Sequence, residues 1–172
     1  MVVTAGNIVL IGMPGVGKST LGVLLAKVTG RNFLDTDVYI QAREERTLRD
    51  IIERDGLARF RAIEERSVLT LQCRNTVIAT GGSVVYGTAA MEHLGATGRV
   101  VHLFLPLNRL RSRLTDFEAR GVVRAPGQSL DSLFEERAPL YQRYAEVAVD
   151  CAGKTHEEIV VELARVACGK AE

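Results

Sequence analysis

The chain has 172 residues, which suits a single domain with a sizeable core, and its hydrophobic (47%) and charged (25%) shares are ordinary for a globular protein. The 22 basic and 21 acidic residues leave a net charge of +1, which gives no reason to expect nucleic acid or an anionic membrane as a partner. No apolar stretch reaches the ~18 residues of a membrane span, and the N-terminus lacks the pattern of a signal peptide. We therefore expect a cytoplasmic monomer.

Short apolar runs alternate along the chain with segments of helical periodicity. The first run, residues 7–11, reads as a buried strand, and residues 18–29 follow with leucines at helical spacing until Gly30 ends the helix. A short strand is expected at residues 32–34. Residues 49–73 are largely helical, with Thr47 as the N-cap and an interruption near Asp55.

The second half of the chain repeats this alternation. We expect strands at 76–79, 99–105 and 147–149, and a final helix at 157–167 that opens with a capping box formed by Thr155 and Glu158. Alternating strands and helices predict an α/β fold in three layers, with a five-stranded parallel sheet between helices, and one domain spanning residues 1–172. Ligands of such sheets bind beyond the carboxyl ends of the strands.

The most specific motif is Gly12-Met13-Pro14-Gly15-Val16-Gly17-Lys18-Ser19, which matches GxxxxGK[ST] at every fixed position. It follows a predicted strand and precedes a predicted helix, as a phosphate-binding P-loop (residues 12–19) requires. The glycines allow backbone N–H groups to face phosphate oxygens, and the helix start adds its positive dipole end. Lys18 should reach the β and γ phosphates of a nucleoside triphosphate, and the Ser19 hydroxyl should bind Mg²⁺.

Acidic residues follow the second predicted strand, in Asp35-Thr36-Asp37. In an extended segment, residues i and i+2 share a face, so both carboxylates would point to the same region. Asp35 could bind Mg²⁺ through water, and Asp37 could accept a proton from an attacking hydroxyl group or orient it. The alternative is a solvated loop in which Asp37 caps a helix.

Two further segments offer groups to an acceptor molecule. Arg61 and Glu64 are three positions apart on a predicted helix and can pair, which would hold Arg61 ready to bind a carboxylate; a surface ion pair is the alternative. Gly81 and Gly82 directly follow the third strand, where glycines let a ligand approach the backbone, although a simple turn would read the same.

Five arginines lie between residues 109 and 124, and the segment passes from a helix into a loop with Gly121 and Gly127. A mobile, arginine-bearing loop suits a lid, about residues 116–128, that excludes water and screens phosphate charge. The alternative is the solvated basic end of a helix.

Taken together, these segments resemble the shikimate kinase family, within the nucleoside monophosphate kinase-like P-loop proteins. The resemblance rests on the P-loop, LDTD at 34–37, FRxxE at 60–64, ATGG at 79–82 and ERAPLY at 136–141, in the family's order and spacing. It implies ATP-dependent transfer of a phosphoryl group to the 3-hydroxyl of shikimate, with Mg²⁺, and an acceptor-binding region at about 36–64.

The resemblance also implies roles for particular residues. Asp37, Lys18 and Arg120 would be catalytic, with Arg120 as the lid arginine, and Ser19 and Asp35 would bind the metal. The acceptor would be bound by Asp37, Arg61, Gly81, Gly82 and Arg137. ATP would be bound by Gly12, Gly15, Val16, Gly17, Lys18, Ser19, Thr20, Arg113 and Arg120.

The chain departs from the family pattern at three places. Leu57 follows Gly56 where the family has Glu, Ser83 stands in place of a third glycine, and the lid reads Arg120-Gly121-Val122-Val123 instead of Arg-Pro-Leu-Leu. Arg124 therefore competes with Arg120 for the lid role. Two other functions stay open: a kinase of the same fold for another carboxylate-bearing polyol such as gluconate, and a non-catalytic nucleotide-binding module.

Overall fold

The structure, a computed structural model, describes residues 6–114 and 122–168. Five parallel strands form one sheet in the order β2-β3-β1-β4-β5. The strands are β1 (Asn7–Ile11), β2 (Asn32–Asp35), β3 (Thr76–Ala79), β4 (Gly98–Phe104) and β5 (Val147–Asp150). Each differs from the predicted strand by at most one residue at either end, so the predicted five-stranded parallel α/β sheet is confirmed.

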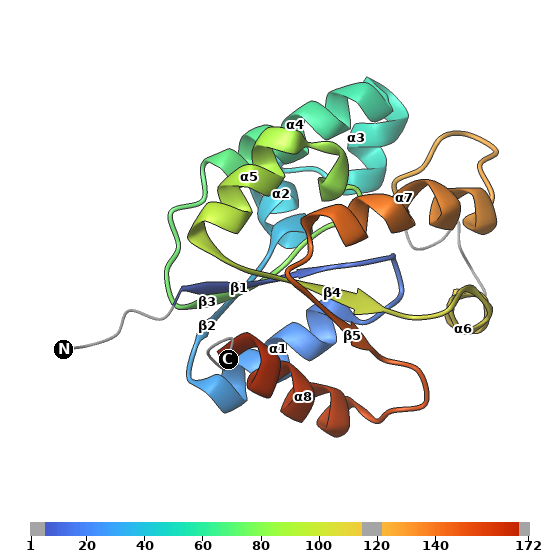
Figure 1. The fold of residues 1–172 in the computed structure, drawn as a ribbon. Helices are drawn as coiled ribbons and strands as arrows, with labels where there is room; N and C mark the ends of the chain where they lie inside the picture. Colours follow the sequence, from blue (N-terminus) through green and yellow to red (C-terminus); the bar gives the residue numbers. More distant parts are fainter. Residues whose placement is uncertain (1–5, 115–121, 169–172) are drawn as a thin grey trace.

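Helices cover both faces of this sheet (Figure 1). Helices α1 and α8 pack together on one face, whereas α2 to α5 and α7 lie over the other. The helices are α1 (Lys18–Thr29), α2 (Thr36–Glu44), α3 (Leu48–Asp55), α4 (Leu57–Leu69), α5 (Thr88–Thr97), α6 (Leu107–Arg113), α7 (Leu130–Tyr144) and α8 (His156–Cys168), with a 3-10 turn η1 (Val84–Tyr86). None of the described helices is long and apolar enough to cross a membrane.

Local signals explain several helix ends. Thr47 and Asp50 form a full capping box at the start of α3, and Gly56 separates α3 from α4, as predicted. At α8, Glu158 accepts a hydrogen bond from the Thr155 N–H at 2.8 Å and its own N–H donates to Thr155 Oγ1 at 3.3 Å, which confirms the capping box predicted there.

The sequence patterns missed other helices. Helix α2 begins directly after β2, and neither it nor α5 nor α7 was predicted. Pro139 lies inside α7, although proline normally disfavours the interior of a helix. Val28, which follows the helical spacing of α1, is 62% exposed and so lies outside the core.

The apolar core falls into two clusters. The larger one surrounds the sheet, and β1 and β3 are buried along their whole length. A smaller cluster lies among α2, α3 and α4 and includes Ile40, Ile51, Phe60, Ile63 and Val123. Because Val123 belongs to the segment predicted as a lid, this cluster joins that segment to the helices that follow β2.

Candidate active site

The P-loop connects β1 to α1 in the predicted position. Three of its glycines have positive φ angles, namely 145° at Gly12, 79° at Gly15 and 108° at Gly17. A side chain at Gly12 would also bring a Cβ to 2.5 Å from the backbone oxygen of Leu103, so this position has no room for another residue. Helix α1 has no acidic residue in its first turn, which leaves its positive end available to an anion.

Lys18 is the first residue of α1 and is only 8% exposed. Its Nζ donates hydrogen bonds to Gly12 O at 2.7 Å and to Met13 O at 3.0 Å, so the side chain folds back over the loop. Burial lowers the pKa of Lys18 to about 8, although the charge of Asp37 opposes this shift. A phosphate group beside Nζ would compensate the buried charge.

The two aspartates after β2 lie differently from the prediction. The strand ends at Asp35, and Asp37 lies in the first turn of α2, so the expected extended arrangement is wrong. The N-cap of α2 is Asp35, whose Oδ1 accepts from the N–H groups of Asp37 at 2.9 Å and Val38 at 3.3 Å. Its Oδ2 accepts from Ser19 Oγ at 2.6 Å, which joins the start of α1 to the start of α2.

Asp37 has a carboxylate oxygen that is available to a ligand. Its Oδ1 is buried and has no hydrogen-bond partner, and a Cβ at Gly81 would lie 2.6 Å from it. Burial, followed by the charge of Asp35, raises the pKa of Asp37 to about 6, while Lys18 opposes the shift. A carboxyl group with a pKa near neutrality is well matched to proton transfer at physiological pH.

Arg137, on α7, is fully buried at 0% exposed. Its Nη2 donates to the carbonyl oxygen of Val123, and its Nε donates to the Tyr86 hydroxyl at 3.2 Å. The remaining Nη1 has no partner and lies beside Gly82, where a Cβ would approach it to 3.0 Å. The protein therefore holds the guanidinium through Nε and Nη2, and Nη1 stays available to a ligand.

Arg61, on α4, does not form the predicted ion pair with Glu64. Its guanidinium instead lies 3.9 Å from the centre of the Tyr86 ring, and its buried Nε has no hydrogen-bond partner. Glu64 accepts a hydrogen bond from Ser83 Oγ at 2.7 Å through Oε2, while its Oε1 is unpartnered. Burial raises the pKa of Glu64 to about 7. The serine that departs from the family's third glycine is thus the partner of a buried acid.

A cavity of about 200 Å³ lies where these groups meet. Lys18, Ser19, Asp37, Gly81, Gly82 and Arg137 line it, together with Pro14, Thr80, Val122 and Val123 from the quoted motifs and with Leu48 and Leu114, which no motif includes. Arg61 lines a second hollow of about 350 Å³ with Tyr86 and Glu64, whereas Arg137 lines the first. They share contact with Tyr86, for which the sequence offered no signal.

The remaining predicted nucleotide-binding residues lie around the P-loop. Arg113, at the end of α6, donates to Val16 O at 3.2 Å, and Thr20 is exposed in the first turn of α1. Arg124 donates to Gln128 O at 2.7 Å. Arg120 lies outside the described residues, as does all of the predicted lid before Val122.

A comparison with known proteins gives consistent matches. A family profile described as "SKI: Shikimate kinase" matches residues 14–167. Among curated relatives, the shikimate kinase of Nitrosococcus oceani is 35% identical over 162 residues (92% of this chain and 85% of that protein), and that of Halorhodospira halophila is 38% identical over 153 residues (87% and 86%).

Solved structures agree with the sequence matches. A shikimate kinase from Acinetobacter baumannii in complex with shikimate has a TM-score of 0.87 at 30% identity, covering 95% of this chain and 93% of that one. A gluconokinase from Sinorhizobium meliloti 1021 has a TM-score of 0.51 at 26% identity, covering 95% and 94%. The fold is therefore much closer to the first structure than to the second.

Proposed function

The chain belongs to the shikimate kinase family, and we propose on that premise that it transfers the γ-phosphoryl group of ATP to the 3-hydroxyl of shikimate. The observation that carries the proposal is the unpartnered Asp37 Oδ1, buried beside Gly81 in a cavity that Lys18 and Arg137 also line. This cavity offers a phosphate site, a group that accepts a proton and a site for a carboxylate within one enclosure. Such a combination suits phosphoryl transfer from a nucleotide to a small hydroxy acid.

The P-loop would hold the triphosphate. Backbone N–H groups of Gly12, Gly15, Val16 and Gly17 and the start of α1 at Lys18, Ser19 and Thr20 surround the position that phosphates take in this motif. The Lys18 ammonium would exchange its hydrogen bonds to backbone oxygens for bonds to phosphate oxygens, which raises its pKa again. Arg113 packs against the loop through Val16 and would lie beside the base.

The proposed metal is Mg²⁺, and the oxygen groups beside the P-loop fit it. Ser19 Oγ and Asp35 Oδ2 lie 2.6 Å apart, and within residues 6–114 and 122–168 no cluster of three or more His, Cys, Asp or Glu side chains offers a cage for a metal. Mg²⁺ typically takes one or two protein oxygens and completes its shell with water and phosphate. When bound, it would neutralise charge on the phosphates.

Asp37 would act on the acceptor hydroxyl. Its unpartnered Oδ1 would accept the hydrogen bond of that hydroxyl, orient the oxygen toward the γ-phosphorus and take the proton as the phosphoryl group transfers. Asp37 interacts electrostatically with Lys18, so its carboxylate lies close to the proposed phosphate site. The lid, at about residues 116–128, would close over the bound phosphates. Arg120, which belongs to it, would place a positive charge beside the phosphoryl group as it transfers.

The acceptor carboxylate would be bound by arginines. Nη1 of Arg137 is buried without a partner and faces the cavity wall at Gly82, and Arg61 would complete the clamp from α4. Gly81 and Gly82 would contact the acceptor through their backbone, because a side chain at either position would collide with the groups around them.

Gluconate is the second candidate acceptor, because it too carries a carboxylate, but the gluconokinase structure aligns much less closely than the shikimate kinase. A non-catalytic binding module has no use for an acceptor base such as Asp37. We further propose one catalytic domain that works as a monomer in the cytoplasm, without nucleic acid.

A coupled assay of ADP release tests the proposal. We expect turnover with ATP, Mg²⁺ and shikimate and little or none with gluconate. The Lys18→Ala variant should fold normally and lose turnover, since the charge of Lys18 serves the phosphates and not the core. Equal turnover with gluconate and shikimate would refute the acceptor assignment. The absence of turnover with every acceptor tested would support the non-catalytic binding module.

A further inference from the structure

Tyr86, in the 3-10 turn after β3, lies between the two arginines of the proposed clamp. Its ring centre is 3.9 Å from the guanidinium carbon of Arg61 and 5.2 Å from that of Arg137. Its hydroxyl also accepts a hydrogen bond from Arg137 Nε at 3.2 Å. One side chain therefore contacts two arginines that come from α4 and α7, and no motif of the sequence includes it.

The direction of each hydrogen bond at the Tyr86 hydroxyl is fixed. The single hydroxyl proton is donated to Glu136 Oε1 at 2.5 Å, so the oxygen is left to accept from Arg137. Burial raises the pKa of Tyr86, and the Tyr86 hydroxyl holds the pKa of Glu136 low, so this arrangement persists at neutral pH. Glu136 Oε2 in turn accepts from Gln128 Nε2 at 2.6 Å.

A tyrosine orients these arginines without neutralising them. Its ring face attracts the Arg61 cation, and its oxygen lone pair holds Arg137, but it carries no charge of its own. An acidic residue in the same place would form an ion pair and compete with a ligand carboxylate. The groups left without partners are Nη1 of Arg137 and Nε of Arg61, and these could bind such a carboxylate.

We propose that Tyr86 is a positioning residue for the acceptor carboxylate: it holds Arg61 by its ring and Arg137 by its hydroxyl, and Glu136 fixes that hydroxyl. The proposal rests on the function proposed above, since it concerns the same acceptor. Pre-ordered arginines reduce the entropy lost when the acceptor binds. Tyr86 therefore governs acceptor affinity, and not the binding of ATP or the chemical step.

Steady-state kinetics of Tyr86→Phe and Tyr86→Leu test this. Tyr86→Phe keeps the ring and loses both hydrogen bonds, so the KM for shikimate should rise about 10-fold, as for the loss of one hydrogen bond to a charged group. Tyr86→Leu also loses the ring, which should raise KM by a further ~3-fold. In both variants, kcat and the KM for ATP should stay within about 2-fold of wild type. Glu136→Gln should raise the KM for shikimate less than Tyr86→Phe does, because the amide oxygen can still accept a hydrogen bond from the Tyr86 hydroxyl.

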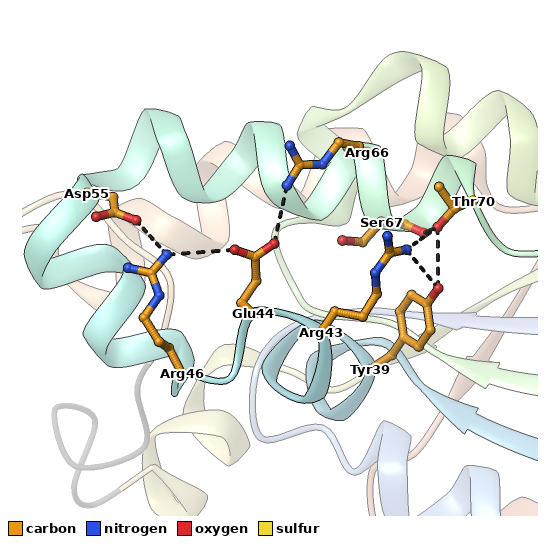
Figure 2. A network of polar contacts seen from close by, with 8 residues as sticks. All are labelled: Tyr39, Arg43, Glu44, Arg46, Asp55, Arg66, Ser67 and Thr70. Carbon is orange, nitrogen blue, oxygen red and sulfur yellow. Dashed lines mark hydrogen bonds and ion pairs between the residues drawn. The ribbon is translucent and has the colours of Figure 1, made fainter.

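Tyr39→Phe is a matched control. Tyr39 likewise contacts an arginine, with the Arg43 guanidinium 5.5 Å from its ring centre and Arg43 Nη1 donating to its hydroxyl at 3.0 Å (Figure 2). Unlike Tyr86, it does not line the hollow that contains Arg61, and it does not line the cavity that contains Arg137. Its replacement should leave every kinetic constant unchanged. Thermal unfolding of each variant checks the fold, and Tyr86→Phe carries the test alone if Tyr86→Leu does not fold.

The outcomes separate the two proposals. A wild-type enzyme that does not phosphorylate shikimate refutes the proposed function and, with it, the acceptor role of Tyr86. An active wild type whose KM for shikimate is unchanged in Tyr86→Phe overturns the role of Tyr86 alone. A parallel rise in the KM values for shikimate and ATP, or a fall in kcat with both KM values unchanged, also overturns it, because either result indicates general damage to the site.

Discussion

At the scale of single residues, the site is defined by buried polar atoms that lack partners. Asp37 Oδ1, Glu64 Oε1 and Arg137 Nη1 come from α2, α4 and α7, and each is buried without a hydrogen bond. An unsatisfied buried polar atom typically costs about 1–3 kcal/mol, so proteins rarely keep several of them together without a use. A bound acceptor that supplies a hydroxyl and a carboxylate would satisfy at least two of the three.

Asp37→Asn is the most direct test of the proposed base. The substitution keeps the size of the side chain and removes the basic oxygen, so kcat should fall by ~10² to 10⁴. ATP affinity should persist, which a binding titration with a nucleotide would measure. If ATP affinity falls and kcat does not, Asp37 is a metal ligand and its role has been confused with that of Asp35.

The pH profile provides an independent reading of the same group. A base must be ionised to accept a proton, and the pKa of Asp37 is about 6. In the wild type, kcat/KM should therefore be level near pH 7 and fall roughly tenfold per pH unit below the pKa of Asp37. The residual activity of Asp37→Asn should lack this fall. A wild-type profile that stays level from pH 7 to pH 5 would contradict the assignment.

At the scale of helices, α2, α3 and α4 form a braced unit that carries one side of the acceptor site. Arg46 lies between Glu44 at 3.7 Å and Asp55 at 2.8 Å, and Arg66 approaches Glu44 at 3.2 Å (Figure 2). These partly exposed ion pairs each contribute little to stability. The apolar cluster beneath them, which includes Phe60 and Ile51, supplies most of the packing that fixes these helices.

The lid is the segment where the proposal depends most on the resemblance. Val123 is buried, at 9% exposed, and its carbonyl oxygen accepts a hydrogen bond from Arg137, so the end of the predicted lid contacts the proposed clamp. Arg124 is held within the same loop by its bond to Gln128 O. The mobility expected of the lid, over about residues 116–128, stays a prediction, because residues 115–121 lie outside the described part of the chain.

Substitution of the two lid arginines distinguishes their roles. Arg120→Ala should lower kcat far more than it weakens ATP binding, because its charge is needed most as the phosphoryl group transfers. Arg124→Ala should change kcat little, since that side chain already bonds to Gln128 O. Single-turnover rates and nucleotide titrations would measure both. If Arg124→Ala lowers kcat and Arg120→Ala does not, the lid arginine is Arg124 and the assignment moves by four residues. If neither variant lowers kcat, the lid carries no catalytic arginine, which would favour a kinase for another acceptor.

At the scale of the whole molecule, the buried acid Glu64 links the site to stability. It is 2% exposed, and burial raises its pKa from 4.5 to about 7 in the folded protein. Below pH 4.5, Glu64 is protonated in both the folded and the unfolded chain. Between pH 4.5 and about 7 the unfolded chain loses the proton while the folded chain keeps it, so folding stability declines as the pH rises through this window.

The Glu64→Gln variant should remove this dependence. A pKa difference of this size corresponds to a contribution on the order of 3 kcal/mol above the folded pKa. Relative to Glu64→Gln, the wild type should therefore lose unfolding free energy as the pH rises from 4.5 to 7, with the difference complete at pH 8. Urea unfolding of both proteins across this range measures it. Parallel stability curves would show that folding does not raise the pKa of Glu64.

The sequence by itself determined the features that depend on neighbouring residues. The P-loop, the five strands, the N-cap at Thr47 and the capping box at Thr155 lie where their patterns predict, because turn geometry, apolar periodicity and capping act within a few positions. The grouping of Lys18 and Asp37 also followed from the sequence, since the carboxyl ends of parallel strands meet at one edge. These signals sufficed for the parallel sheet and the P-loop, but not for α2, α5 and α7.

Only the tertiary structure decided which side chains hold the site groups in place. Helix α2 begins one residue after β2 because Asp35 caps it while accepting from Ser19, a contact across 16 positions. Arg61 contacts the ring of Tyr86 instead of forming the predicted pair with Glu64. Glu64 accepts a hydrogen bond from Ser83, which is 19 positions away in the sequence. Competition between local and distant partners depends on which atoms are buried together, and no pattern along the chain specifies that.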